Sequence, residues 1–306
     1  MANGITDFQI PIGDWVADGV DWIQINLTGV LDGISEVLEL VIDSFEGGLQ
    51  AVPPVLLAAL IVVIATWRVG WKFGLFSVAA MVLIFGMGIW PETISTLALV
   101  IASSLVALII GIPIGIAMAR HDPVEAVVRP VLDFMQTMPP FVYLIPAAIF
   151  FGLGKVPGSI ATLIFAMPPA VRLTNLGIRQ VSEEHVEAGK AFGCTNHQLL
   201  FKVQLPLAMP SIMAGINQTI MLALSMVVIA SMIGAGGLGN TVLTGIQRLD
   251  VGLGFEGGLG VVLLAILLDR ITQSFGAVGG AAAAPSFVGR MRQAFERWKE
   301  SQSSDV

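Results

Sequence analysis

Charged residues are scarce in this sequence of 306 residues. Asp, Glu, Lys and Arg together make up 12% of it, about half of the roughly 25% that is usual in soluble domains. Hydrophobic residues make up 55%. This composition excludes an ordinary soluble protein and favours a chain whose main solvent is lipid.

Cysteine, histidine and phosphate-binding loops are also sparse. The single cysteine, Cys194, excludes a disulfide within the chain. His121, His185 and His197 have neither the spacing nor the neighbours of a metal site or a catalytic triad. The glycine-rich run Gly234 to Gly239 lacks the Lys of a nucleotide-binding loop. We therefore expect no catalytic residue, no metal and no bound cofactor on this chain.

Basic residues are missing from the first 52 residues, which carry nine carboxylates and hence a formal charge of −9. Because a secretory signal needs a basic start, we expect no cleaved signal peptide. The whole chain has a formal net charge of −7, and no nucleic-acid partner is expected.

Long uncharged runs are what the sequence does contain. A membrane-spanning helix needs about 20 apolar residues, and the runs predict an all-α, polytopic membrane protein with about seven spans. The fourth and fifth runs are short, but Val131 to Met138 can extend the fourth, and residues through Leu176 the fifth. The runs are Val55 to Trp67, Phe73 to Trp90, Thr93 to Ala119, Phe141 to Leu153, Val156 to Val171, Ser211 to Ile233 and Gly257 to Leu268.

Lys and Arg gather after every second run, around residues 68–72, 120–129, 172–202 and 290–299. Short basic connections stay in the cytoplasm, so the N-terminus is predicted outside and the C-terminus inside. Lys155 and Arg248 fall on predicted outer loops and are exceptions. The chain divides into an acidic extracytoplasmic segment (1–52), a membrane domain (53–277) with a cytoplasmic loop (179–206), and a cytoplasmic tail (278–306).

The acidic segment has apolar residues three or four apart, from Val16 to Phe45, and predicts an amphipathic helix. Trp15 and Trp22 can anchor it at the membrane interface, and Pro53-Pro54 ends it before the first span. Two interpretations stay open: a helix packed on the outer face, or a docking surface for a partner.

The loop 179–206 is too polar to cross the membrane. Ser182 suits a helix cap, Glu183 and Glu184 suit a first turn, and Gly193 ends that short helix. A second short helix is expected over Asn196 to Val203, with Pro210 opening the next span.

The spacing within this loop resembles the EAA loop of binding-protein-dependent ABC importer permeases. The matching residues are Glu187, Ala188, Gly189, Gly193, Val203, Leu205 and Pro206, with Gly189 in place of Ala and Val203 in place of Ile. The resemblance implies a coupling helix that sits in a groove of a separate ATPase subunit, where ATP and Mg are bound. Glu187 would contact the ATPase, and Gly193 would permit the turn.

Nearly the whole chain resembles the glycine betaine/proline betaine permeases of the osmoprotectant uptake family. Three stretches carry the resemblance: Pro11 to Val16, Gln136 to Pro146 and Ile233 to Gly239. It implies the type I importer fold in the bacterial inner membrane, with the chain as a homodimer among lipids. Two ATPase subunits and an extracytoplasmic binding protein would complete the transporter, and this chain would not be an enzyme.

Polar residues inside spans are the candidates for a substrate path, although interhelical hydrogen bonding explains them equally. The polar candidates are Asn217, Gln218, Thr219 and Ser225, and the further candidates are Met135, Pro139 and Tyr143. Gly111 and Gly115 favour close helix packing or a kink rather than a dimer interface. A gate or helix break near the outer face is expected at Gly234, Gly236, Gly237 and Gly239.

The sequence leaves the cargo open among glycine betaine, proline betaine, choline, carnitine and trimethylamine N-oxide. A permease for methionine or another amino acid is the alternative within the ABC class. Outside it, an ion-coupled secondary carrier would show buried carboxylates or an inverted repeat, and a mechanosensitive channel is a third option.

Overall fold

The computed structural model describes residues 11–276, which are helical almost throughout. Thirteen α-helices and one short π-helical turn follow one another in these residues, and no strand occurs among them. Their bounds are α1 (Ile12–Asn26), α2 (Thr28–Ala51), α3 (Pro54–Arg68), α4 (Trp71–Gly86), α5 (Trp90–Arg120), α6 (Asp122–Thr137), α7 (Pro140–Phe151), α8 (Lys155–Arg179), α9 (Glu183–Ala191), α10 (Asn196–Leu199), η1 (Leu200–Gln204), α11 (Leu205–Ser231), α12 (Gly237–Arg248) and α13 (Val251–Gly276).

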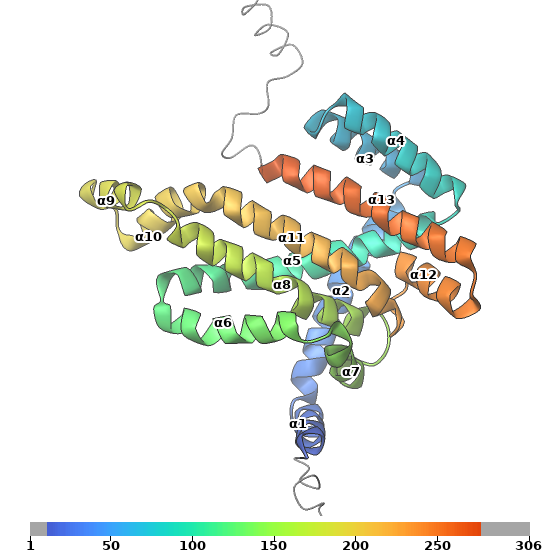
Figure 1. Ribbon diagram of the computed structural model, residues 1–306, viewed down its shortest axis with the longest axis horizontal. Coiled ribbons are helices and arrows are strands. Elements are labelled where there is room, and N and C mark those ends of the chain that lie inside the picture. Colours follow the sequence, from blue (N-terminus) through green and yellow to red (C-terminus); the bar gives the residue numbers. More distant parts are fainter. Residues whose placement is uncertain (1–10, 277–306) are drawn as a thin grey trace, which may run out of the picture.

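The membrane domain is built around α8, which packs along α11 and α5. The α8–α11 pair carries α9 and α10 at one end, whereas α7 and α12 lie toward the other end (Figure 1). The α3–α4 pair lies beside α13, and α1 projects away from the rest of the chain on the end of α2 (Figure 1). The predicted tail, residues 278–306, lies outside the described residues.

Glycine makes the close packing of these helices possible. A Cβ atom on Gly115 of α5 would lie 2.6 Å from the carbonyl oxygen of Val171, and one on Gly177 of α8 would lie 2.7 Å from Cβ of Ser211. Gly111 also faces α8, so both glycines of the 111–115 pair serve packing within the chain, as predicted.

Each of the seven predicted apolar runs falls largely on a helix, which confirms the all-α membrane fold. Within residues 11–276, four helical stretches are each long and apolar enough to cross a membrane. Two bent pairs raise the number to six if each pair is one span, and α4 is a shorter apolar helix. The four long stretches are Trp90–Arg120, Lys155–Arg179, Asn196–Ser231 and Val251–Phe275.

Val131 to Met138, the predicted extension of the fourth span, lies on α6, which meets α7 at 99°. The two helices together are apolar enough for one broken span, but residues 131–138 do not continue α7 as a straight helix. Pro139-Pro140 lacks two N–H donors, and Met138 is extended (φ −70°, ψ 131°), so the helix ends there. Two details of the sequence prediction are wrong. The predicted outer loop that carries Arg248 contains the helix α12. The second short loop helix, which begins at Asn196, continues into α11, so that Pro210 lies inside that helix and does not open it.

Replacement of Gly115 by Ala is expected to lower the free energy of unfolding by about 1–3 kcal/mol, because the added methyl forces α5 away from the α8 backbone. Gly258→Ala in α13 is the matched control, since nothing lies within 4 Å of its added Cβ. Thermal unfolding of the two purified variants in detergent measures the difference. Equal midpoints would contradict the packing argument.

Candidate functional site

The short helix α9 ends in a glycine-dependent turn. Gly193 has a φ of +77°, which favours glycine because it has no Cβ. Its N–H donates to the carbonyl of Lys190, and the N–H of Cys194 donates to that of Gly189. These two bonds make a Schellman motif, so Gly193 is required by the backbone conformation rather than by lack of space.

Gly189 is the one fully buried residue of α9. A Cβ at this position would lie 2.7 Å from Cδ1 of Leu199, a buried side chain of α10. The glycine that departs from the EAA pattern therefore lets α9 lie directly on the start of the α10–α11 helix.

The outer face of α9 is fully available for contact. Glu187 and Ala188 are exposed, and Phe192 is 90% exposed at the end of the helix. Ser182 occupies the N-cap position, but its hydroxyl bonds the ring of His185 rather than a backbone N–H. Phe192 was not among the predicted contact residues, although a large aromatic residue in a polar loop is a visible signal in the sequence.

The helix after α9 runs into the next span without a break. Thr195 and Gln198 form a reciprocal capping box at its start. The five residues of η1 then carry the chain to Leu205 and Pro206, and Pro206 falls in the first turn of α11. A proline is tolerated there because the wider turn before it removes the need for its N–H.

A polar cluster around Arg179 holds the end of α8, where the loop 179–206 begins. The Arg179 guanidinium donates to the carbonyl of Met118 (2.8 Å) and pairs with Asp122 (2.6 Å) and Glu125 (2.9 Å). Its Nε also donates to Asn175 at 3.1 Å. The cluster joins the end of α8 to α5 and α6, three segments that sequence reasoning did not bring together.

Tyr143 is buried, and its hydroxyl donates to the carbonyls of Met135 (3.2 Å) and Met138 (3.3 Å). These bonds satisfy acceptors at the end of α6 and stabilise the 99° bend. Met135 is half-buried and Pro139 is exposed beside the bend. Tyr143 therefore has a structural role at the α6–α7 bend, next to the predicted substrate path.

Three of the four polar candidates of α11 separate into two environments. Asn217 donates to Asp269 at 2.8 Å and accepts from Thr272 at 2.7 Å, so it joins α11 to α13 by interhelical hydrogen bonds. Gln218 and Ser225 are exposed on another side of α11. Only these two present polar groups outward from the middle of the span.

The glycine-rich run lies where the chain breaks between α11 and α12. Gly234, Gly236 and Gly237 have φ values of +86°, +77° and +68°, a conformation that side-chain-bearing residues rarely adopt. Gly239 has an ordinary φ, but a Cβ there would lie 2.3 Å from the carbonyl oxygen of Val227. The N–H of Leu238 donates to the Thr96 hydroxyl at 2.8 Å, which fixes α12 to α5.

The chain matches a family of known transport proteins. The model described as "Binding-protein-dependent transport system inner membrane component" matches residues 111–289. The glycine betaine/carnitine transport permease GbuB of Listeria monocytogenes is 53% identical over 270 residues, which are 87% of this chain and 95% of that protein. The glycine betaine/proline betaine permease ProW of Escherichia coli is 48% identical over 87% of this chain and 75% of its own length.

More distant relatives share the fold. The trimethylamine N-oxide permease TmoV of Ruegeria pomeroyi is 37% identical over 80% of this chain and 38% of its own length. An inward-facing crystal structure of the methionine ABC transporter MetNI matches with a TM-score of 0.57 at 20% identity, over 63% of this chain and 96% of that chain. At this identity the likeness to MetNI shows the fold alone.

Replacement of Arg179 by Met is expected to lower the free energy of unfolding by about 1–3 kcal/mol, because it leaves Glu125 and the Met118 carbonyl short of donors. Arg129→Met is the control, since its side chain is 65% exposed and pairs with Glu125 only one turn away. Its expected loss is below about 0.5 kcal/mol. Thermal unfolding in detergent measures the loss of stability in both variants. Equal losses would show that the Arg179 cluster does not hold the end of α8 in place.

Proposed function

The chain belongs to the family of inner membrane components of binding-protein-dependent transport systems, and on this premise we propose that it imports glycine betaine or a related small methylated amine. The observation that carries the proposal is the 53% identity to a glycine betaine/carnitine permease along 95% of that protein's length. Relatives named for proline betaine and trimethylamine N-oxide support the same chemical class. Carnitine and choline are the further candidates.

The chain is a permease subunit rather than an enzyme, as its relatives are. We propose that ATP and Mg are bound by two copies of a separate ATPase. Two copies of this permease and an extracytoplasmic binding protein would complete the importer. The proposed orientation places α9 in the cytoplasm and α1 outside, in agreement with the distribution of basic residues.

The contact with the ATPase is proposed for α9. Its outer face offers Glu187, Ala188 and the 90% exposed ring of Phe192. A protruding aromatic side chain is the kind of residue that anchors a protein interface when it enters a pocket of the partner. Gly189 lies beneath this face, where it lets α9 pack on Leu199. Leu205 and Pro206 begin α11, the helix into which a movement of the loop would be transmitted.

The substrate path is proposed along the side of α11 that carries Gln218 and Ser225. Polar side chains that face lipid cost free energy. The exposed amide of Gln218 and hydroxyl of Ser225 therefore support a water-filled path, or a second copy of the permease, on this side of α11. Tyr143 is the one tyrosine of the chain, and its hydroxyl is engaged. Strong aromatic binding of a methylated cation is therefore proposed for the binding protein. The glycine break between α11 and α12 is proposed as a gate.

Family membership separates this function from the two alternatives outside the ABC class, the ion-coupled carrier and the mechanosensitive channel. The amino-acid alternative rests on MetNI, whose 20% identity supports the fold and no cargo.

Uptake of radiolabelled glycine betaine into proteoliposomes tests the cargo. We expect uptake only when ATP, the permease, the ATPase and the binding protein are all present, with competition from proline betaine, carnitine, choline or trimethylamine N-oxide. A reconstituted transporter that takes up methionine and none of these amines would overturn the proposal.

Replacement of Gly193 by Val is expected to reduce ATP-driven uptake at least tenfold, because a β-branched residue does not adopt a φ of +77°. Gly193→Asn is the matched control, since Asn tolerates this conformation and should retain most of the uptake. Uptake and ATP hydrolysis are measured on the same proteoliposomes. Equal uptake by both variants and the wild type would contradict the proposed role of the α9 turn in coupling.

A further inference from the structure

The break segment between α11 and α12, residues 232–236, contacts the start of α8. The N–H of Gly154 donates to the carbonyl of Ile233 at 2.8 Å. Four residues on, Gly158 faces Ala235, and a Cβ at Gly158 would lie 2.8 Å from the Ala235 methyl. The start of α8 and the break segment are therefore in direct contact and must move together or separate.

The helix α2 covers the same segment from another side. Ala235 is 2% exposed and lies in one apolar cluster with Ile42 of α2, which is 1% exposed. Leu99 and Ala102 of α5 and Ala230 of α11 complete this cluster, and Val41 and Phe45 of α2 pack against it. The acidic N-terminal segment and the predicted gate thus share one apolar cluster.

An ion pair between Glu46 and Lys155 joins the two elements that hold the break segment. Glu46 lies one helical turn after Ile42 on α2, and Lys155 follows Gly154 at the start of α8. Their side chains are 13% and 36% exposed. Three contacts then form a closed circuit: α2 with the break segment, the break segment with α8, and α8 with α2.

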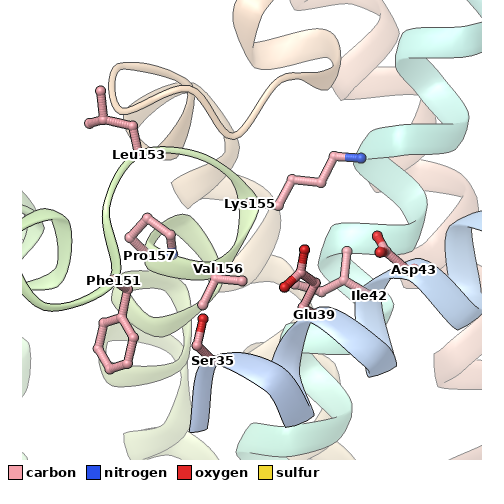
Figure 2. A pocket seen from close by; sticks show the side chains of 9 residues that line it. All are labelled: Ser35, Glu39, Ile42, Asp43, Phe151, Leu153, Lys155, Val156 and Pro157. Atoms are coloured by element: carbon pink, nitrogen blue, oxygen red, sulfur yellow. The ribbon is translucent and has the colours of Figure 1, made fainter. Parts of the chain in front are cut away.

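A cavity lies beside the ion pair, lined by residues of α2 and of the start of α8. Its volume is about 370 Å³, with Lys155, Glu39 and Asp43 along one side and Phe151 and Leu153 across it (Figure 2). Glu39 and Asp43 have no ion-pair partner among residues 11–276. Lys155 thus pairs with one carboxylate, Glu46, of a face of α2 that also carries Glu39 and Asp43.

We propose that Glu46 and Lys155 form a clamp that keeps the break segment seated against α2, with both side chains acting as positioning residues for the gate. Glu46 lies outside the part of the chain that matches the family model, whereas Lys155 and the break segment lie inside it. The clamp therefore ties a helix outside the region that matches the family model to elements inside that region.

The seating of the break segment is measured directly by thiol labelling. In a Cys194→Ser background, Ala235→Cys places a buried thiol in the segment, and its rate of reaction with a water-soluble maleimide reports how often the segment leaves α2. Ser231→Cys, at a 3% exposed residue that directly precedes the segment, is a near-isosteric second reporter if the first variant does not fold.

Lys155→Met keeps the apolar stem and removes the charge, and should raise the labelling rate about two- to fivefold, as expected for loss of a partly exposed ion pair. Glu46→Gln should do the same. The exchanged pair Glu46→Lys with Lys155→Glu should recover at least half of the change. The control Glu39→Gln removes a carboxylate from the same cavity and should label as the wild type does.

Labelling rates of Lys155→Met that equal the wild type, a rise of equal size in Glu39→Gln, or no recovery in the exchanged pair would each overturn the clamp. This measurement needs no substrate, so it stands apart from the proposed function. The transport consequence rests on that function: Lys155→Met should raise the ATP hydrolysed per molecule imported about twofold or more, while Lys155→Arg should restore the wild-type ratio. An unchanged ratio alongside faster labelling would overturn the clamp's role in gating.

Discussion

The contact of α8 with α5 and α11 is the constraint on which the rest of the structure depends. Gly115 lets α5 approach α8 to within reach of its backbone, and Gly177 does the same for the start of α11. In lipid, helices associate through close packing and buried polar contacts rather than through the hydrophobic effect. The position of α9 at one end of this core and of the glycine break at the other follows from it.

The apolar runs and the EAA spacing were readable from the sequence because each depends on local chemistry. Lipid demands long uncharged helices, and a positive φ demands glycine at position 193. The break at Gly234 was foreseeable for the same reason. Direct signals of this kind predicted the membrane fold and the short helix and glycine turn in the loop 179–206.

Other features escaped prediction because they depend on residues far apart in the chain. Arg179 was counted only as an inside charge, whereas its partners Met118 and Asp122 lie about 60 positions earlier. The short helix α12 begins with glycines and ends near Arg248, so it resembled a loop. Lys155 was an exception to the charge rule until the structure placed it against Glu46.

The unbroken helical run from Asn196 to Ser231 is longer than the thickness of a membrane requires. Its 36 residues measure about 54 Å at 1.5 Å per residue, and the hydrocarbon core is about 30 Å thick. Even at a steep tilt of 40°, the run spans about 41 Å along the membrane normal, roughly 11 Å more than the core. The polar side chains of His197 and Lys202 indicate that the excess lies at this end of the run, so α9, which packs on it, lies beyond the hydrocarbon core, within reach of groups dissolved in water.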